Sequence, residues 1–192
     1  MDDSLLLWIN QGWAHPWLDA LFGWVSQRAA FSFPLLLLIL ALFVQRWKMA
    51  GIKLWLILVG AILLGDLLGN VVKHSIEQYR PCVTLADTVR LVESPFAIGC
   101  STKPHGMPSN HALDFFLAAA FVGTVLRSWR WGLSLGTTAV VVGLSRIYLG
   151  VHYPSQVLAG ALLGVGLGLL AAGLTLRYAA FASRLQHHPA AS

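Results

Sequence analysis

Residues 52–72 read IKLWLILVGAILLGDLLGNVV, and this stretch decides the fold class. A helix of about 20 apolar residues crosses the roughly 30 Å hydrocarbon core of a bilayer. Asp66 and Asn70 lie inside the stretch. Polar side chains within a span face the interior of a helix bundle or a functional site. We therefore expect a membrane-spanning helix that packs against other helices.

Four further apolar stretches occur at residues 29–45, 111–126, 131–150 and 155–176. The chain of 192 residues is 57% hydrophobic and 11% charged, with a mean hydropathy of +0.69. A typical water-soluble domain has about a quarter of its residues charged, so the composition excludes that class. The sequence predicts an all-α, polytopic transmembrane helix bundle of five to six spans.

The chain divides into three regions. Residues 1–28 are too polar to span a membrane and carry Trp8, Trp13 and Trp17, which predicts amphipathic helices at the membrane interface. Residues 29–177 form the predicted transmembrane catalytic bundle, and residues 178–192 a cytoplasmic tail. No cleavable signal peptide is expected.

Basic residues cluster after the first, third and fifth spans, which identifies that side as the cytoplasm. The loop at residues 73–107 and the turn at residues 151–154 then face outward.

Although the net charge is +5, the basic residues are scattered, so no nucleic-acid partner is expected. Arg90 and Lys103 are interpreted as anchors at the membrane surface, and Gly160, Gly164 and Gly168 as packing positions within the bundle rather than a dimer interface.

Three polar clusters lie at the outer ends of the spans: Lys73 with Arg80 and Pro81; Pro108, Ser109, Asn110 and His111; and Ser145 and Arg146 with His152. Guanidinium groups bind phosphate oxygens through paired hydrogen bonds, and a helix N-terminus favours anions. Of two histidines, one can attack phosphorus while the other protonates the leaving oxygen. The clusters predict a phosphoryl-transfer site. No metal-ligand spacing is present, so neither a metal nor another cofactor is expected.

The three spaced clusters resemble the signature of the type 2 phosphatidic acid phosphatase (PAP2) superfamily, over residues of about 50–170. The resemblance implies that His152 is the nucleophile and His111 the general acid. It implies that four further residues hold the phosphate: Lys73, Arg80, Ser109 and Arg146. The implied setting is a bacterial inner membrane, with the site facing the periplasm or cell exterior.

This chain departs from the family pattern at two positions. Asn110 replaces the usual glycine, and Gln156 replaces the aspartate that usually follows the nucleophilic histidine by four residues. A glutamine carbonyl can fix the tautomer of His152 but brings no negative charge. We expect Gln156 to orient the ring. For Asp66 and Asp114 two roles stay open: they supply the missing charge beside the ring, or they neutralise the nearby basic cluster.

The resemblance favours a lipid phosphatase that acts on undecaprenyl diphosphate or another lipid phosphate, with membrane lipids as the other partners. Phosphatidylglycerophosphate, phosphatidate and lipid A remain alternative substrates, and a lipid could replace water as the phosphoryl acceptor. A transporter or scaffold that only binds anionic headgroups is the alternative outside enzymes. The pattern leaves the oligomeric state open. Because Cys82 and Cys100 share the outward loop, on the oxidising side, we also predict that they form a disulfide.

Overall fold

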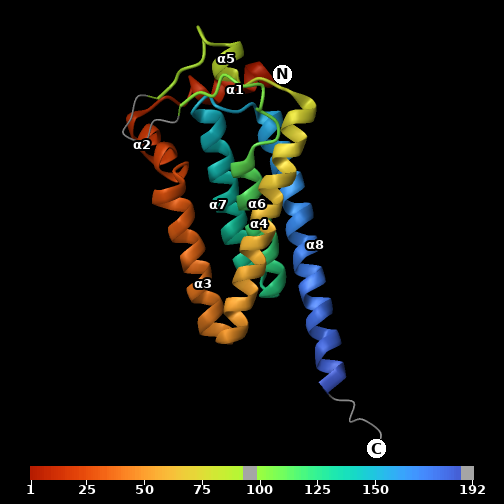
Figure 1. The fold of residues 1–192 in the computed structure, drawn as a ribbon. Helices are drawn as coiled ribbons and strands as arrows, with labels where there is room; N and C mark the ends of the chain where they lie inside the picture. Colours follow the sequence, from red (N-terminus) through yellow and green to blue (C-terminus); the bar gives the residue numbers. More distant parts are fainter. Residues whose placement is uncertain (93–98, 187–192) are drawn as a thin grey trace, which may run out of the picture.

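The computed structural model describes residues 1–92 and 99–186, and for residues 180–186 it describes the backbone alone. Every regular element in these residues is a helix, which confirms the all-α prediction. Figure 1 shows the long helices running side by side, with shorter helices gathered at one end of the bundle. The last residues of the predicted tail, 187–192, lie outside the described part of the chain.

The long helices match the predicted spans closely. They are α3 (Phe33–Trp47), α4 (Met49–Ile76), α6 (Asn110–Val125), α7 (Trp129–Tyr148) and α8 (Pro154–Gln186). A short π-helical segment, η1 (Arg28–Ser32), leads directly into α3. Within the described residues, three segments are long and apolar enough to cross a membrane, Arg28–Trp47, Met49–Thr84 and Pro154–Ala179, and a shorter apolar helix covers Asn110–Leu126.

Two helix ends differ from the sequence prediction. Helix α4 continues through Lys73 to Ile76, where the predicted loop should already have begun. It stops at Glu77, whose backbone adopts the left-handed conformation (φ 48°). Helix α8 extends through most of the predicted tail, to Gln186. Because α4 continues past it, Lys73 lies within a helix and not in the loop.

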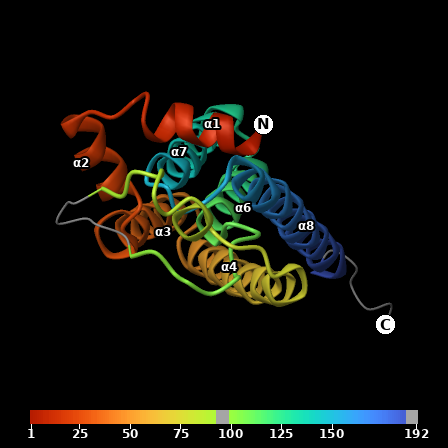
Figure 2. The ribbon, with the colours of Figure 1, turned by 90° about the horizontal axis from the view of Figure 1, so that it is seen from above.

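Helix α6 occupies the centre of the bundle and contacts α4, α7 and α8. Seen from above, it lies among these three helices (Figure 2). Its side chains Leu113, Leu117 and Phe121 are fully buried. Burial of each such side chain contributes roughly 1.5–3 kcal/mol in water-soluble proteins, and close packing replaces that effect where lipid surrounds a helix. The N-terminus of α6 is therefore held in one position by three neighbouring helices.

The glycines of α8 pack against α6, which confirms the prediction of packing within the bundle. A Cβ atom at Gly160 would lie 2.3 Å from the Ser109 carbonyl oxygen, and one at Gly164 would lie 2.3 Å from that of Leu113. At Gly168 the corresponding distance to Leu117 is 2.4 Å. These separations are too short for any side chain, so the two backbones meet directly.

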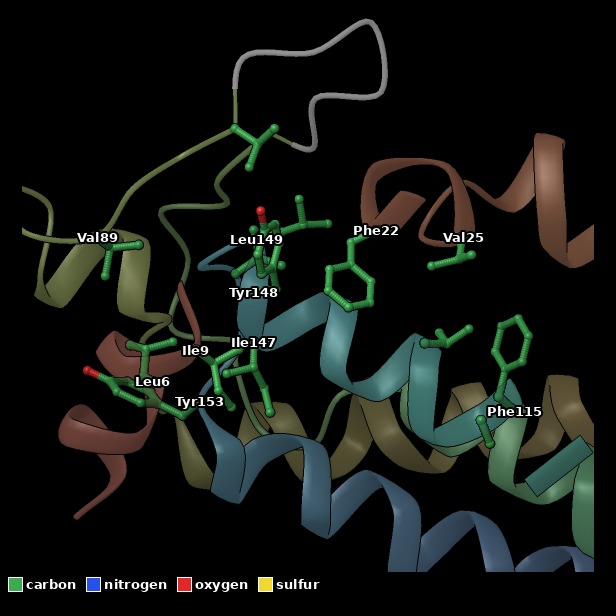
Figure 3. Packing of buried hydrophobic residues seen from close by; sticks show 14 residues of the cluster. Leu6, Ile9, Phe22, Val25, Val89, Phe115, Ile147, Tyr148, Leu149 and Tyr153 are labelled. Atoms are coloured by element: carbon green, nitrogen blue, oxygen red, sulfur yellow. The ribbon is translucent and has the colours of Figure 1, made fainter. Parts of the chain in front are cut away.

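The short helices α1 (Asp2–Asn10), α2 (Pro16–Val25) and α5 (Pro81–Thr84) lie at one end of the bundle (Figure 1). The turns α3–α4 and α6–α7, which carry the first and third basic clusters, lie at the opposite end. Leu6, Phe22 and Val25 from the short helices pack with Tyr148 and Phe115 in one buried cluster (Figure 3). Some side chains of residues 1–28 therefore contribute to the core at this end.

Buried polar contacts fasten the N-terminal region to the long loop. The Asn10 side chain is fully buried; it donates to the carbonyl oxygens of Arg90 (2.8 Å) and Tyr148 (2.7 Å) and accepts from the Arg90 amide. The Arg90 guanidinium donates to both oxygens of Asp19, at 3.1 and 2.9 Å. The interpretation of Arg90 as a membrane anchor is thus wrong, because its charge is paired within the protein.

Asp19 lies outside the membrane-spanning segments. Its carboxyl is ionised, which strengthens the ion pair with Arg90. Burial raises the pKa of the Asp19 carboxyl, but hydrogen bonds from Arg90 and Tyr148 outweigh that effect and bring the pKa below its usual value.

Cys82 and Cys100 are joined by a disulfide with a Cα–Cα distance of 6.1 Å, as predicted. The disulfide closes part of the loop between α4 and α6 and begins two residues after Arg80.

Candidate active site

The helix ends that carry the three sequence clusters lie at the end of the bundle where the short helices gather (Figure 1). Lys73 lies near the end of α4, Ser109 caps α6 and His111 follows in its first turn. Arg146 lies in the last turn of α7, and His152 in the connection between α7 and α8. Because these helices pack around α6, residues far apart in sequence converge there.

His152 is held by Gln156, one helical turn further along the chain. The Gln156 side-chain oxygen lies 3.0 Å from His152 Nδ1 and accepts the Tyr153 amide at 3.2 Å. Its amide nitrogen donates to the Tyr79 carbonyl at 3.0 Å. Since the atom that accepts the Tyr153 amide must be the oxygen, His152 Nδ1 must carry the proton. The other ring nitrogen, Nε2, then keeps its lone pair free for attack.

The environment of His152 favours the neutral ring. The side chain is buried, and it lies outside the spanning segments. Burial, followed by the positive charges of Arg146 and Arg80, lowers the pKa of His152 well below its usual value. A neutral imidazole is the nucleophilic form. The ring is therefore unprotonated at Nε2 at physiological pH.

Several hydrogen-bond donors near the His152 ring have no acceptor in the described part of the chain. They are the Nε atoms of Arg80 and Arg146, Nη1 of Arg146 and the Ser109 hydroxyl, all of them buried. Buried polar groups are normally hydrogen-bonded, and an unpaired charged donor is especially costly. A tetrahedral oxyanion would supply acceptors for all of them, so this set of donors fits a phosphate group.

Lys73 is only 8% exposed and its ammonium donates to the Asn110 side-chain oxygen at 2.6 Å. The Asn110 amide in turn donates to Asp66 at 2.5 Å. The residue that departs from the family pattern in the second cluster thus connects the lysine to a carboxylate. It orients Lys73 while leaving two of the three ammonium protons for other acceptors.

The second histidine, His111, contacts a residue that the sequence analysis did not single out. His111 Nε2 lies 3.2 Å from the Ser26 carbonyl oxygen, which can only accept, so this nitrogen carries a proton. The Ser26 hydroxyl lies 2.6 Å from that of Ser145, next to Arg146. Ser26 belongs to the N-terminal region, which carries no motif that would have revealed it.

Asp66 and Asp114 do not contact His152 in the described residues, which favours the alternative that they neutralise the basic cluster. Each instead has a carboxylate oxygen 3.8 Å from Nη2 of Arg28. The sequence could not decide between the two roles, because the direction of each side chain depends on how its helix is rotated against its neighbours. In the described residues, no group of three His, Cys, Asp or Glu side chains could hold a metal ion.

Comparison with known proteins points to one family. The model of the PAP2 superfamily matches residues 54–178, which include all three clusters. An undecaprenyl-diphosphatase of Sulfolobus acidocaldarius is 34% identical over 131 residues, covering 68% of this chain and 58% of the relative. Phosphatidylglycerophosphatase B of Bacillus subtilis is 34% identical over 167 residues, covering 82% and 75%.

The fold agrees with a solved structure. The crystal structure of Aquifex aeolicus LpxE superposes with a TM-score of 0.68 at 27% identity, covering 88% of this chain and 93% of that one. This chain spans about half the length of several curated relatives that it matches, between 45% and 58%. The family match covers more than half of the chain and includes every residue of the three clusters. This chain belongs to the PAP2 superfamily.

Proposed function

We propose that this protein is an integral-membrane lipid phosphatase that acts through a phosphohistidine intermediate on His152. The observation that carries the proposal is the buried His152 ring, whose Nδ1–H donates to the Gln156 side-chain oxygen. Near it lie the unpaired donors of Arg80, Arg146 and Ser109. A headgroup-binding scaffold would need the cations but not a neutral imidazole fixed in one tautomer.

In the first step, His152 Nε2 attacks phosphorus and forms a P–N bond while the P–O bond to the leaving group breaks. His111 acts as the imidazolium, with protons on both ring nitrogens, a form that the negative charge of the bound phosphate favours. The leaving oxygen takes the proton that His111 holds at Nε2, and the ring becomes neutral. Arg80, Arg146, Lys73 and Ser109 stabilise the charge that spreads over the other phosphate oxygens. These side chains supply the positive charge that a metal ion provides in other phosphatases.

In the second step, water attacks the phosphorus of phospho-His152. His111, now without its proton, accepts one from the water, the P–N bond breaks and inorganic phosphate leaves. Both histidines then regain their starting protonation. An acceptor lipid in place of water would make the same chain a phosphotransferase.

The proposed substrate is a polyprenyl diphosphate such as undecaprenyl diphosphate. The name of the Sulfolobus relative supports this class. Phosphatidylglycerophosphate is the second candidate, because the Bacillus relative matches over more of both chains. The proposed location is the bacterial inner membrane with the site on the outer side, since the basic turns α3–α4 and α6–α7 lie at the opposite end of the bundle.

A panel assay tests the proposal. The purified protein in detergent is given undecaprenyl diphosphate, phosphatidylglycerophosphate, phosphatidate, lipid A and glucose 6-phosphate, and released phosphate is measured with and without a chelator. We expect the highest kcat/KM for undecaprenyl diphosphate, no effect of the chelator and no release by His152→Ala. Phosphate release by His152→Ala at the wild-type rate would refute the mechanism, and a preference for another lipid would refute the substrate. Transfer to an added lipid alcohol instead of water would identify a phosphotransferase.

A further inference from the structure

A cavity of about 220 Å³ opens between α3, α4 and α6 beside His111. Its walls are mainly apolar, and include Leu36, Ile39, Ile62 and Phe115. At the polar end it is lined by His111 together with Arg28, Asp66 and Asp114. The cavity thus has a charged end, and the rest of its lining is apolar. This arrangement suits a lipid with a charged headgroup and a hydrocarbon chain.

Arg28 is the basic residue of this cavity that the phosphatase mechanism does not use. Its Nη2 atom lies 3.8 Å from Asp66 Oδ2 and 3.8 Å from Asp114 Oδ2, so neither contact is a hydrogen bond. The Arg28 side chain is 52% exposed, whereas the two aspartates are 23% and 18% exposed. The carboxylates therefore keep the guanidinium near the cavity while leaving its N–H groups available to another acceptor.

Arg28 also lies next to the proposed general acid. His111 contacts the carbonyl of Ser26, two residues before Arg28, and the positive charge of Arg28 acts on the His111 ring. Arg28 begins the π-helical segment η1. Such segments occur frequently at functional sites.

The direction of the reaction determines what occupies this region. The attacking nitrogen and the leaving oxygen stand on opposite sides of phosphorus. His111 protonates the leaving oxygen, so the leaving group must lie on the His111 side, where the cavity is. With a lipid monophosphate the leaving group is an uncharged alcohol. With a lipid diphosphate it is a second phosphate, which needs its own cation.

We propose that Arg28 binds the leaving phosphate of a lipid diphosphate and so favours diphosphates over monophosphates. This inference deepens the proposed function and rests on it. His152 Nε2 bonds to the terminal phosphorus, and the bond from that phosphorus to the bridging oxygen breaks. The bridging oxygen leaves with the lipid monophosphate and takes the proton of His111. Arg28 moves from the two carboxylates to the non-bridging oxygens of this leaving phosphate.

The test compares farnesyl diphosphate with farnesyl monophosphate, which share one hydrocarbon chain and differ by a single phosphate. Wild type, Arg28→Gln and Arg28→Lys are assayed for kcat/KM on both. We expect Arg28→Gln to lose about tenfold to hundredfold on the diphosphate, the usual effect of losing a hydrogen bond to a charged group, and less than about twofold on the monophosphate. Arg28→Lys should retain an intermediate rate on the diphosphate, because a lysine keeps the charge without the paired donors.

Arg46→Gln is the matched control, since Arg46 is exposed at the other end of α3 and should affect neither substrate. Equal losses by Arg28→Gln on both substrates would overturn the inference and give Arg28 a structural role. No loss on either substrate would also overturn it. A wild-type enzyme that hydrolyses neither farnesyl compound but releases phosphate from another lipid would instead refute the proposed substrate, which separates the two failures.

Discussion

A neutral amide, that of Gln156, orients the ring of the proposed nucleophile His152. Gln156 is fully buried and uses both ends of its amide, accepting from His152 and Tyr153 and donating to Tyr79. A carboxylate could fill the two acceptor roles but not the donor role. The neutral amide also leaves the positive charges around His152 uncompensated, which keeps the ring unprotonated and available for attack.

Gln156→Ala should lower kcat by about tenfold to hundredfold, the range found when a hydrogen-bond partner that orients a metal-bound histidine is removed. The substitution leaves the His152 Nδ1 proton and the Tyr153 amide without an acceptor in a buried site, so the ring can turn. Phosphate release at saturating substrate measures the effect. Asp114→Asn is the comparison, because Asp114 does not contact His152 and its replacement should leave the ring in place. Wild-type kcat in Gln156→Ala would contradict this role.

Gln156→Glu should shift the acid side of the pH–rate profile to higher pH. Burial and the neighbouring cations lower the pKa of His152 well below its usual value, so the wild-type ring stays neutral and active into the mildly acidic range. An added carboxylate favours the protonated ring and raises that pKa. Activity should therefore disappear at a higher pH in the variant than in wild type, as measured by kcat/KM between about pH 4 and 8. An identical acid limb would show that His152 does not control it.

The central helix pair α6 and α8 holds the site together through backbone contact. Gly164 is the clearest position, because its Cβ would lie 2.3 Å from the Leu113 carbonyl oxygen, whereas Gly166 on the same helix has open space. Gly164→Ala should force the helices apart and lower the midpoint of thermal unfolding in detergent by several degrees. Gly166→Ala should have no such effect, because alanine is the better helix former. Equal behaviour of the two variants would contradict the packing.

The disulfide between Cys82 and Cys100 acts on the loop that carries Arg80. In the chain-entropy model, closing a loop of this length stabilises the folded chain by about 3 kcal/mol. We therefore expect a reducing agent to lower the midpoint of thermal unfolding of the wild-type protein by several degrees. The double variant Cys82→Ser and Cys100→Ser should already melt lower and should not respond to the reductant. A wild-type midpoint that the reductant does not move would refute a stabilising role.

The helices of the bundle could be predicted because each span is a long apolar stretch that ends in charged residues. The end of α4 could not, since the left-handed backbone of Glu77 leaves no clear mark on the sequence. The rotation of each helix about its axis also escapes sequence reasoning. Asp66 and Asp114 lie on the expected helices, α4 and α6, and the packing of these helices directs them toward Arg28 rather than toward His152.

At the scale of the whole molecule, the N-terminal region completes a site whose recognisable residues all come later in the chain. The spacing of the three clusters predicted which side chains to examine. Ser26 and Arg28 belong to no motif, so only the fold reveals that they lie beside His111 and its cavity. Asn10 likewise connects α1 to Arg90 and Tyr148, across a large separation in sequence. We therefore interpret residues 1–28 as part of the catalytic unit, and their position at the membrane interface stays a prediction.

The most direct test of the central claim is to trap the covalent intermediate. Enzyme mixed with a labelled lipid diphosphate is quenched rapidly in alkali, digested and analysed by mass spectrometry, in wild type and in His152→Ala and His111→Ala. We predict phosphate that is stable in alkali and labile in acid on His152 of wild type, and none in His152→Ala. His111→Ala should still form the intermediate when the leaving group is a good one, because protonation then matters less. Phosphate trapped on any other residue, or turnover by His152→Ala, would contradict the account.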